Sequence, residues 1–277
     1  MTQRLAVIGY PLSHTLSPVI HGAAIHALEL DLTYDAVDLP PQSLPQFITK
    51  LSGSEWLGLN VTVPHKQAVM PYLAELSNEA QAIGAVNTIA VKVEGLVGHN
   101  TDARGFLADV EDHFGPVAGK RVAVLGAGGA AHAVCYALKD LAERVWVLNR
   151  TPERAQRLAD RFGLESGGME VMSESDLIVN CTSAGLHEGD SPIPDASMPK
   201  GANLYDLIYN PAETRLMKAV REGGGKAVNG LGMLVRQAAV SFEIWTGVEP
   251  PLDVMFDAAR AAHDSRLMTP DSRAAHV

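Results

Sequence analysis

Residues 122–134 read VAVLGAGGAAHAV, and this stretch decides how the second half of the chain folds. A β-branched run ends in Gly126, Gly128 and Gly129, and small residues typical of a tightly packed helix follow. Glycines can also simply end a strand, but a strand before them and a helix after them favour a dinucleotide-binding turn. In such a turn Gly126 permits the tight reversal, Gly128 lets the backbone approach a pyrophosphate, and the small Ala131 allows close helix packing.

Similar apolar runs recur on the C-terminal side of this turn, with helical patterns between them. The runs are RVWVLN (144–149), DLIVN (176–180), NLYDLIY (203–209) and KAVNG (226–230). One intervening segment begins with Pro152 after Thr151, repeats apolar residues at helical spacing and ends at Gly163, which predicts a helix. Continuous apolar strands separated by helices indicate a parallel sheet covered on both faces.

The first half of the chain shows the same alternation on a smaller scale. Strands are predicted at 4–9, 33–37 and 57–63, a helix at 18–28 and a hairpin at 88–100. The segment from Leu234 onward reads as helices. We therefore expect an α/β protein of two domains: a first α/β domain at 1–102, a Rossmann-type parallel-sheet domain at 103–235, and C-terminal helices at 236–277.

Composition limits the class of protein. The 277 residues are 47% hydrophobic and 19% charged, enough apolar material for a real core, and the net charge of −10 disfavours nucleic acid or an anionic membrane as partner. Cys135 and Cys181 lie in apolar runs, so neither a disulfide framework nor a metal site is expected. Without a signal-like or long apolar segment, the expected location is the cytoplasm.

The end of the second strand of the parallel sheet indicates which dinucleotide binds. NAD enzymes usually carry an acidic residue there for the ribose 2′-hydroxyl, whereas this chain has Asn149, Arg150 and Thr151, with Arg154 one turn later. Guanidinium groups match a phosphate in shape and charge, so the pattern predicts NADP. The alternative is that both arginines are solvated surface charges.

Polar residues of the first domain mark a second candidate site. Thr15 and Ser17 precede a helix, where their hydroxyls and the free backbone N–H groups suit a carboxylate, although Ser17 could serve only as the helix N-cap. Asn60 and Thr62 alternate with apolar residues and therefore share one face of their strand. Lys66 follows after a proline, and a solvated lysine is the alternative reading.

Further polar residues lie where the two domains should meet. Asn87 enters a strand, and Asp102 ends the segment GHNTD at the predicted junction. Clefts between domains are common sites for small molecules. If Lys66 and Asp102 meet there, they form a donor and acceptor pair able to move a proton to or from a carbonyl or hydroxyl oxygen during hydride transfer.

Nine segments in series resemble the shikimate dehydrogenases, of the shikimate/quinate dehydrogenase family. They are GYPLSHTLSPVIH, NVTVPHK, GAVNT, GHNTDARG, GAGGAAHA, NRTPERA, NCTSAG, DLIYNPAET and NGLGMLVRQA, and they span nearly the whole chain. The resemblance implies an N-terminal substrate domain, a Rossmann domain that binds NADP, and C-terminal helices that return to the first domain. The implied reaction is the reversible NADPH-dependent reduction of 3-dehydroshikimate to shikimate, without a metal, in aromatic amino acid biosynthesis.

The resemblance also assigns roles to individual residues. Lys66 and Asp102 become the catalytic pair. The substrate is implied to contact Thr15 and Ser17 through its carboxylate, Tyr209 near that carboxylate, and Asn60, Thr62, Asn87, Asp102 and Gln237 through its hydroxyls. NADP is implied to contact Gly126, Gly128, Gly129, Ala130, Asn149, Arg150, Thr151 and Arg154, with Thr182, Ser183, Gly230 and Met233 at its nicotinamide end.

Two positions depart from the family pattern. The family usually has serine where Thr15 stands, and the extra methyl narrows the carboxylate end of the pocket, so quinate remains a competing substrate. Asn229 replaces a family aspartate near the nicotinamide side. A quinate or quinate/shikimate dehydrogenase and a non-catalytic NADP-binding regulator are the alternative functions, and the oligomeric state stays open, with a homodimer as one option.

Overall fold

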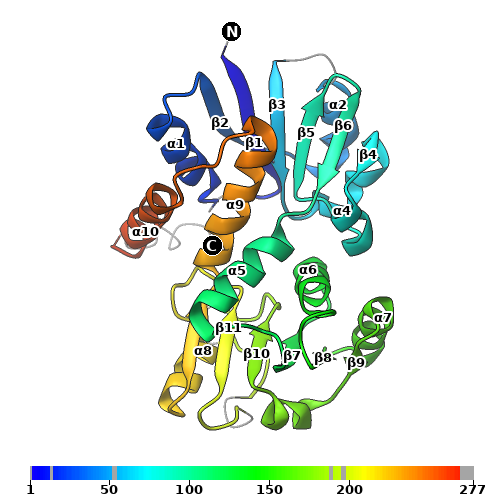
Figure 1. The fold of residues 1–277 in the computed structure, drawn as a ribbon, viewed down its shortest axis with the longest axis vertical. Helices are drawn as coiled ribbons and strands as arrows, with labels where there is room; N and C mark the ends of the chain where they lie inside the picture. The colour runs from blue at the N-terminus through cyan, green and yellow to red at the C-terminus, as the bar shows by residue number, and fades with distance from the viewer. Residues whose placement is uncertain (1, 13–14, 52–54, 187–189, 195–197, 269–277) are drawn as a thin grey trace, which may run out of the picture.

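The computed structural model describes residues 2–12, 15–51, 55–186, 190–194 and 198–268. Two α/β domains lie one above the other along the long axis of the molecule, each built on its own sheet (Figure 1). The fold expected from the sequence is confirmed: an N-terminal α/β domain, a Rossmann-type domain, and C-terminal helices that return to the first.

The second domain contains the predicted parallel sheet. Its strand order is β12-β11-β10-β7-β8-β9, and every neighbouring pair is parallel. This is the strand order of a doubly wound dinucleotide-binding fold. From the central neighbours β7 and β10, successive strands are added toward opposite edges of the sheet. The strands are β7 (Arg121–Leu125), β8 (Arg144–Leu148), β9 (Glu165–Ser166), β10 (Leu177–Asn180), β11 (Asn203–Asp206) and β12 (Lys226–Asn229).

Helices cover both faces of this sheet, which explains its continuous apolar strands. Alternate residues of β7 enter two different core clusters, Val122 and Val124 on one face and Ala123 and Leu125 on the other. The covering elements include α6 (Gly129–Leu138), α7 (Pro152–Phe162), α8 (Arg215–Glu222) and the short 3-10 helix η3 (Met169–Glu174).

The predicted helix after the second strand is confirmed as α7. Pro152 occupies its first turn, and Gly163 ends it in the left-handed conformation at φ 68°. Strand β11 is shorter than the predicted 203–209. It ends at Asp206 because the backbone then turns: Ile208 N donates to the Asp206 side chain at 3.1 Å.

The first domain has a mixed sheet in the order β2-β1-β3-β5-β6-β4. The predicted hairpin is confirmed as the antiparallel pair β5 and β6, with Gly95 at φ 135° in its turn. Strand β3 ends at Val61, two residues earlier than predicted, because His65 N closes a turn onto Thr62 O at 2.8 Å. The strands are β1 (Gln3–Gly9), β2 (Leu32–Asp38), β3 (Trp56–Val61), β4 (Glu75–Leu76), β5 (Thr88–Lys92) and β6 (Gly95–His99).

Helices flank this mixed sheet. The predicted helix at 18–28 is α1 (Ser17–Ala27), which begins and ends one residue earlier than expected. The other helical elements of the domain are η1 (Pro41–Ser43), α2 (Leu44–Thr49), α3 (His65–Ala68), η2 (Met70–Tyr72) and α4 (Asn78–Ile83).

Two long helices join the domains. The chain leaves the first domain through α5 (Asp102–Phe114) and returns to it through α9 (Leu231–Thr246), while α10 (Leu252–Met268) packs on α1 (Figure 1). Helices α5 and α9 approach closely at Gly105, where a Cβ atom would lie 2.7 Å from the Gln237 nitrogen. In the described part of the chain, none of the helices is both long and apolar enough to cross a membrane.

The expected domain boundary between residues 235 and 236 falls inside α9. This helix is one continuous hydrogen-bonded unit, so a cut there would divide it. We propose instead that the second domain ends at Gly230, directly before α9 begins.

Candidate active site

A cavity of about 310 Å³ lies between the two domains, as the sequence predicted for the site. Eleven of the residues singled out in the sequence line it: Ser17, Asn60, Thr62, Lys66, Asn87, Asp102, Ala130, Tyr209, Gly230, Met233 and Gln237. Val7, Val61, Leu207 and Leu234 complete the lining. A larger open hollow of about 630 Å³ lies between α1 and β2, but its lining includes none of the predicted site residues, so the chemistry belongs to the smaller cavity.

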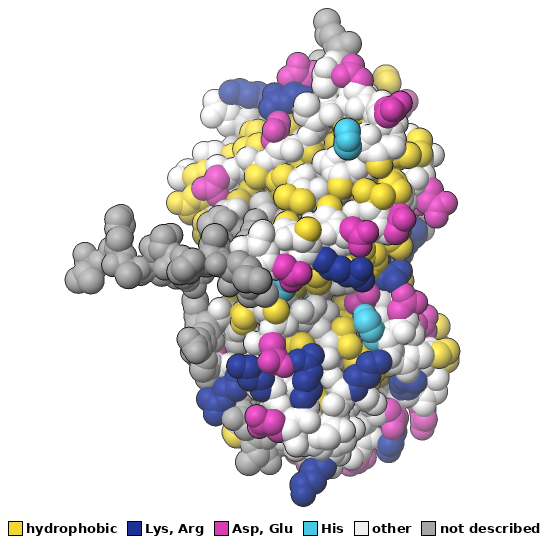
Figure 2. Space-filling view, turned by 90° about the vertical axis from the view of Figure 1, so that its left-hand side faces the viewer, with side chains coloured by type: hydrophobic (Ala, Val, Ile, Leu, Met, Phe, Trp, Pro, Cys, Tyr) yellow, Lys and Arg dark blue, Asp and Glu magenta, His cyan; other side chains and the backbone are white. Residues whose placement is uncertain are grey.

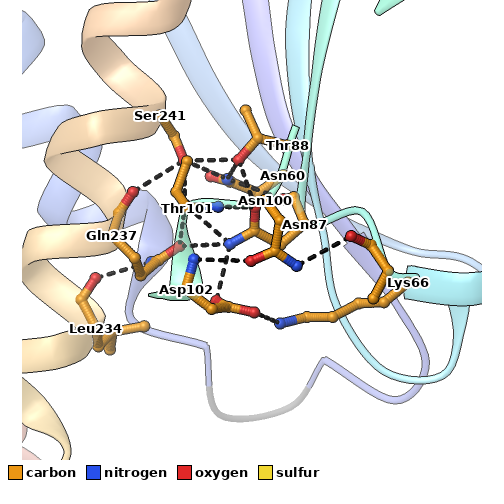
Figure 3. A network of polar contacts seen from close by, with 11 residues as sticks. Asn60, Lys66, Asn87, Thr88, Asn100, Thr101, Asp102, Leu234, Gln237 and Ser241 are labelled. Atoms are coloured by element: carbon orange, nitrogen blue, oxygen red, sulfur yellow. Dashed lines mark hydrogen bonds and ion pairs between the residues drawn. The ribbon is translucent and has the colours of Figure 1, made fainter. Parts of the chain in front are cut away.

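Lys66 and Asp102 meet in this cavity. The Lys66 Nζ atom donates to Asp102 Oδ2 at 2.6 Å (Figure 3). The lysine comes from α3, just after β3, and the aspartate is the first residue of α5. Their side chains are 24% and 9% exposed, so Lys66 is not a freely solvated charge, and the pair faces the cavity rather than bulk water.

Asn87 holds the carboxylate of this pair. Its Nδ2 donates to Asp102 Oδ1 at 2.8 Å and to Thr101 Oγ1 at 2.9 Å, and its Oδ1 accepts from Thr101 N at 2.9 Å (Figure 3). Asn100 Oδ1 accepts from Asp102 N at 3.0 Å. Both Asp102 carboxylate oxygens therefore have a defined partner, which fixes the direction of the carboxylate.

Asn60 is buried and bonded on both sides of its amide. Its Nδ2 lies within hydrogen-bond distance of Asn87 O, Thr88 Oγ1 and Ser241 Oγ, at 3.1 to 3.2 Å. Its Oδ1 accepts from Tyr34 OH at 2.7 Å. Tyr34, Thr88 and Ser241, which hold the Asn60 amide, were not among the site residues predicted from the sequence. Polar residues at buried positions of β5 and α9 were the available signal, but their partners are distant in the sequence.

The helix α9 brings the far end of the chain into the same network. Gln237 Oε1 lies 3.3 Å from both Asn87 Nδ2 and Thr101 Oγ1, and its Nε2 donates to Leu234 O at 2.8 Å (Figure 3). Thr62 lies just past the end of β3, and it lines the cavity together with Asn60 and with Val61 between them. Tyr209 reaches the cavity from the turn after β11.

The hydroxyl pair before α1 differs from the N-cap alternative. Leu16 is the N-cap residue of α1, and Ser17 is the first residue of the helix, so Ser17 does not cap it. Thr15 Oγ1 instead lies 3.2 Å from Ser17 Oγ and accepts from Ser17 N at 3.3 Å. Ser17 lines the cavity, whereas Thr15 is not part of the lining and contacts Ser17 through these two bonds. The Ser17 hydroxyl, supported by Thr15, therefore forms a polar end of the cavity.

The glycine turn after β7 has the geometry of a dinucleotide site. Gly126 has φ 108°, and a Cβ there would lie 3.1 Å from the Thr182 methyl. Gly128 and Gly129, at the start of α6, are exposed, and a Cβ on either would have no neighbour within 4 Å. The turn therefore presents bare backbone to solvent at the N-terminus of a ten-residue helix, as a pyrophosphate requires. Ala130, next along α6, lines the cavity.

The predicted 2′-phosphate residues lie together after β8, away from the cavity lining. Arg150, Thr151 and Arg154 are exposed, and Asn149 Nδ2 donates to Thr151 O at 3.0 Å. Neither guanidinium group has a hydrogen bond or ion pair with another residue in the described ranges, whereas the Arg154 backbone N–H donates to Thr151 O at 3.0 Å. Basic side chains are spread over one face of this lower domain (Figure 2). By contrast, Arg144 at the start of β8 is paired with Glu165.

A buried carboxylate orders Thr182, one of the residues expected at the nicotinamide end. Thr182 Oγ1 donates to Asn180 Oδ1 at 2.8 Å, and Asn180 Nδ2 donates to Asp206 Oδ1 at 2.9 Å. Burial raises the pKa of Asp206, while its hydrogen bonds to Thr214, Ile208 and Asn180 oppose the rise. Ser183 is exposed beside Thr182. Neither Thr182 nor Ser183 lines the cavity, whereas Gly230 and Met233 do.

Asn229, the departure from the family aspartate, has a clear structural role. Its Nδ2 donates to Ala212 O at 3.0 Å, and its Oδ1 accepts from Leu231 N at 3.2 Å, at the start of α9. An aspartate could accept from Leu231 N but could not donate to Ala212 O. The amide therefore ties the loop after β11 to the start of α9.

Comparison with known proteins identifies the family. The model described as "Shikimate dehydrogenase substrate binding domain" matches residues 7–89, "Shikimate / quinate 5-dehydrogenase" matches 108–187, and "Shikimate 5'-dehydrogenase C-terminal domain" matches 230–260. A shikimate dehydrogenase (NADP(+)) from Carboxydothermus hydrogenoformans is 42% identical over 266 residues, covering 92% of this chain and 95% of its own. One from Thermus thermophilus is 43% identical over 261 residues, covering 94% and 98%.

A solved structure has the same architecture. It is the crystal structure of a shikimate 5-dehydrogenase from Thermus thermophilus in complex with NADP(H) and shikimate. The two structures superpose with a TM-score of 0.89 at 41% identity, over 94% of this chain and 99% of that one. With relatives above 40% identity along nearly its full length, this chain belongs to the shikimate dehydrogenase family.

Proposed function

We propose that this enzyme carries out the reaction of its family, the reversible NADP-dependent interconversion of 3-dehydroshikimate and shikimate, in the cavity between its domains. The observation that carries the proposal is the Lys66–Asp102 pair, joined at 2.6 Å inside a cavity lined by both domains. A residue pair able to move a proton thus shares one cavity with Ala130, at the start of the helix that follows the glycine turn.

The substrate lies against the first domain in this proposal. Ser17 and Thr15 bind the carboxylate with the help of backbone N–H groups at the start of α1, an 11-residue helix. The ring hydroxyls contact Asn60, Thr62, Asn87, Asp102 and Gln237, all of which line the same cavity, and Tyr209 closes the carboxylate end.

The second domain fits a dinucleotide. Gly128 and Gly129 leave the space that a pyrophosphate needs, and Arg150 with Arg154 supplies charge for a 2′-phosphate. Asn149 and Thr151 add hydrogen bonds beside them, and Thr182, Ser183, Gly230 and Met233 border the nicotinamide. When bound, NADP supplies the hydride donor or acceptor.

Lys66 and Asp102 manage the proton. In the reducing direction, a proton must reach the carbonyl oxygen as its carbon gains hydride. In this proposal Lys66 Nζ gives a proton to that oxygen in the reducing direction and takes it back in the oxidising direction, while Asp102, held by Asn87, keeps the lysine in place.

The test is an assay of NADP⁺ and NAD⁺ reduction with shikimate and with quinate as substrates. We expect the highest kcat/KM with shikimate and NADP⁺. A preference for quinate would replace the substrate assignment, in keeping with the methyl group of Thr15 at the carboxylate end. Absence of turnover with either substrate would support the regulator alternative.

Two further proposals concern location and assembly. We place the protein in the cytoplasm, where thiols stay reduced, because Cys135 and Cys181 are both free and burial raises the pKa of each thiol. A homodimer is the assembly to test first, by light scattering across a concentration series.

A further inference from the structure

The hydroxyl of Tyr34 lies behind the substrate wall rather than in it. Tyr34 is on the edge strand β2, and its hydroxyl donates to Asn60 Oδ1 at 2.7 Å. Tyr34 does not line the cavity, whereas Asn60 does. The hydroxyl of Ser17, which also lines the cavity, lowers the pKa of Tyr34, although burial dominates and raises it well above its ordinary value.

The orientation of the Asn60 amide follows from its neighbours. The Asn87 carbonyl oxygen can only accept, so the NH₂ group of Asn60 must face it, at 3.2 Å. The hydroxyls of Thr88 and Ser241 lie within hydrogen-bond distance of the same NH₂ group. Its two hydrogens therefore have three possible acceptors. On the oxygen side, the Tyr34 hydroxyl donates to Asn60 Oδ1 at 2.7 Å, and the buried His21 ring also interacts with Asn60, which opposes the lowering of the His21 pKa by burial.

The position of Tyr34 is itself fixed by packing. Its ring stacks on the His21 ring at a centroid distance of 4.3 Å and an interplanar angle of 9°. His21 also contacts the Trp245 ring at 5.3 Å and is fully buried. Burial lowers the pKa of His21 to about 3, so this ring is neutral and stacks without a charge. The tyrosine is thus held by helices from both ends of the chain.

We propose that Tyr34 is a positioning residue. Its hydrogen bond fixes the orientation of the Asn60 side-chain amide and thereby raises the affinity of the cavity for the substrate hydroxyls that contact Asn60. The inference rests on the proposed function, because Asn60 is there a contact of the substrate hydroxyls. Tyr34 acts on substrate binding and not on the proton transfer, which belongs to Lys66 and Asp102 at the other end of the network.

The test compares Tyr34→Phe with the parent in steady-state kinetics. Phenylalanine keeps the ring that stacks on His21 and removes only the hydroxyl. One hydrogen bond of this kind is worth about 0.5 to 1.5 kcal/mol, so we expect the KM for shikimate to rise about 2- to 12-fold. The kcat and the KM for NADP⁺ should stay within about twofold. An unchanged KM for shikimate overturns the proposal. A kcat that falls by the same factor as the KM rises also overturns it.

A double-mutant cycle separates positioning from general damage. If Tyr34 acts through Asn60, adding Tyr34→Phe to Asn60→Ala should change the KM for shikimate less than about twofold. Full additivity of the two effects overturns the proposal. The matched control is Tyr205→Phe, which removes another buried phenol hydroxyl, bonded to Asp109 at 2.7 Å outside the cavity. This control should leave the KM for shikimate within about twofold.

The parent enzyme's oxidation of shikimate is measured first. If the parent does not turn over shikimate, both the proposed function and this inference fall. A normal parent with an unaffected Tyr34→Phe variant overturns this inference alone.

Discussion

The two walls of the cleft use their polar groups in opposite ways. On the substrate side, Asn60, Asn87 and Asp102 are buried and bonded to protein. On the dinucleotide side, the backbone at Gly128 is bare. The guanidinium groups of Arg150 and Arg154 are exposed and have no hydrogen bond or ion pair with another residue in the described ranges. The first wall is preorganised for a small rigid ring, since its groups need little rearrangement on binding. The second holds a long charged ligand through charge and open backbone.

The largest expected effect tests the centre of the buried wall. Replacing Lys66 with Ala removes the group that meets Asp102 at 2.6 Å, and kcat should fall on the order of 10²- to 10⁴-fold, the usual range for a positioned proton-transfer group. Steady-state kinetics with shikimate and NADP⁺ measure it, with exposed Lys92→Ala as the control. If kcat stays within about threefold and only KM rises, Lys66 is a binding residue.

The second prediction tests the open wall. Changing both Arg150 and Arg154 to Ala should raise the KM for NADP⁺ at least about tenfold, because even one charge-assisted phosphate contact is worth roughly 1.5 to 3 kcal/mol. The KM for NAD⁺, which lacks the phosphate, should change little. Arg157→Ala, an exposed arginine on the same helix, is the control. Equal parental efficiency with NAD⁺ and NADP⁺ would contradict this assignment.

The third prediction concerns pH and the packing behind the buried wall. Burial lowers the pKa of His21 from 6.5 to about 3, so the unfolded chain takes up the proton first as pH falls. The free energy of unfolding should therefore be intact above pH 6.5 and be lost progressively toward pH 3, by about 2 kcal/mol between pH 7 and pH 5.

Urea unfolding at both pH values, for the parent and His21→Phe, measures this loss. The variant should lose about 2 kcal/mol less than the parent, because it has no imidazole to protonate. The exposed His26 on the same helix is the control, and His26→Gln should keep the pH dependence of the parent. Identical slopes for the parent and His21→Phe would show that His21 is not the group responsible.

The smallest expected effect probes the carboxylate end, where the buried wall departs from its family. Thr15→Ser keeps the hydroxyl that contacts Ser17 and removes one methyl. One methyl in a pocket is worth about 1 to 3 kcal/mol, so the ratio of kcat/KM for shikimate over quinate should fall by roughly tenfold. Both substrates are assayed with both proteins. A parent that prefers quinate refutes the substrate assignment, and an unchanged ratio refutes the role of Thr15.

Local patterns in the sequence carried much of this result. The glycine turn, the parallel strands, helix α7 with its terminal Gly163, and the β5–β6 hairpin all depend on residues close together in the chain. The departures were equally local in origin: β11 ended early because Asp206 bonds the next turn, and Leu16, not Ser17, is the N-cap residue of α1. A capping residue is chosen by backbone geometry, which residue type favours but does not fix.

Local sequence patterns were enough to predict the fold class, the cofactor-binding turn and the residue types of the site, because each depends on short-range periodicity and chemistry. Only the tertiary structure decided that Lys66 meets Asp102, that Tyr34 and Ser241 hold Asn60 across 26 and 181 positions of sequence, and that Asn229 ties a loop to α9. Hydrogen bonds need partners within about 3.5 Å and correctly aimed. Which distant residues satisfy that condition is set by the packing of two sheets and the return of α9, not by any local pattern.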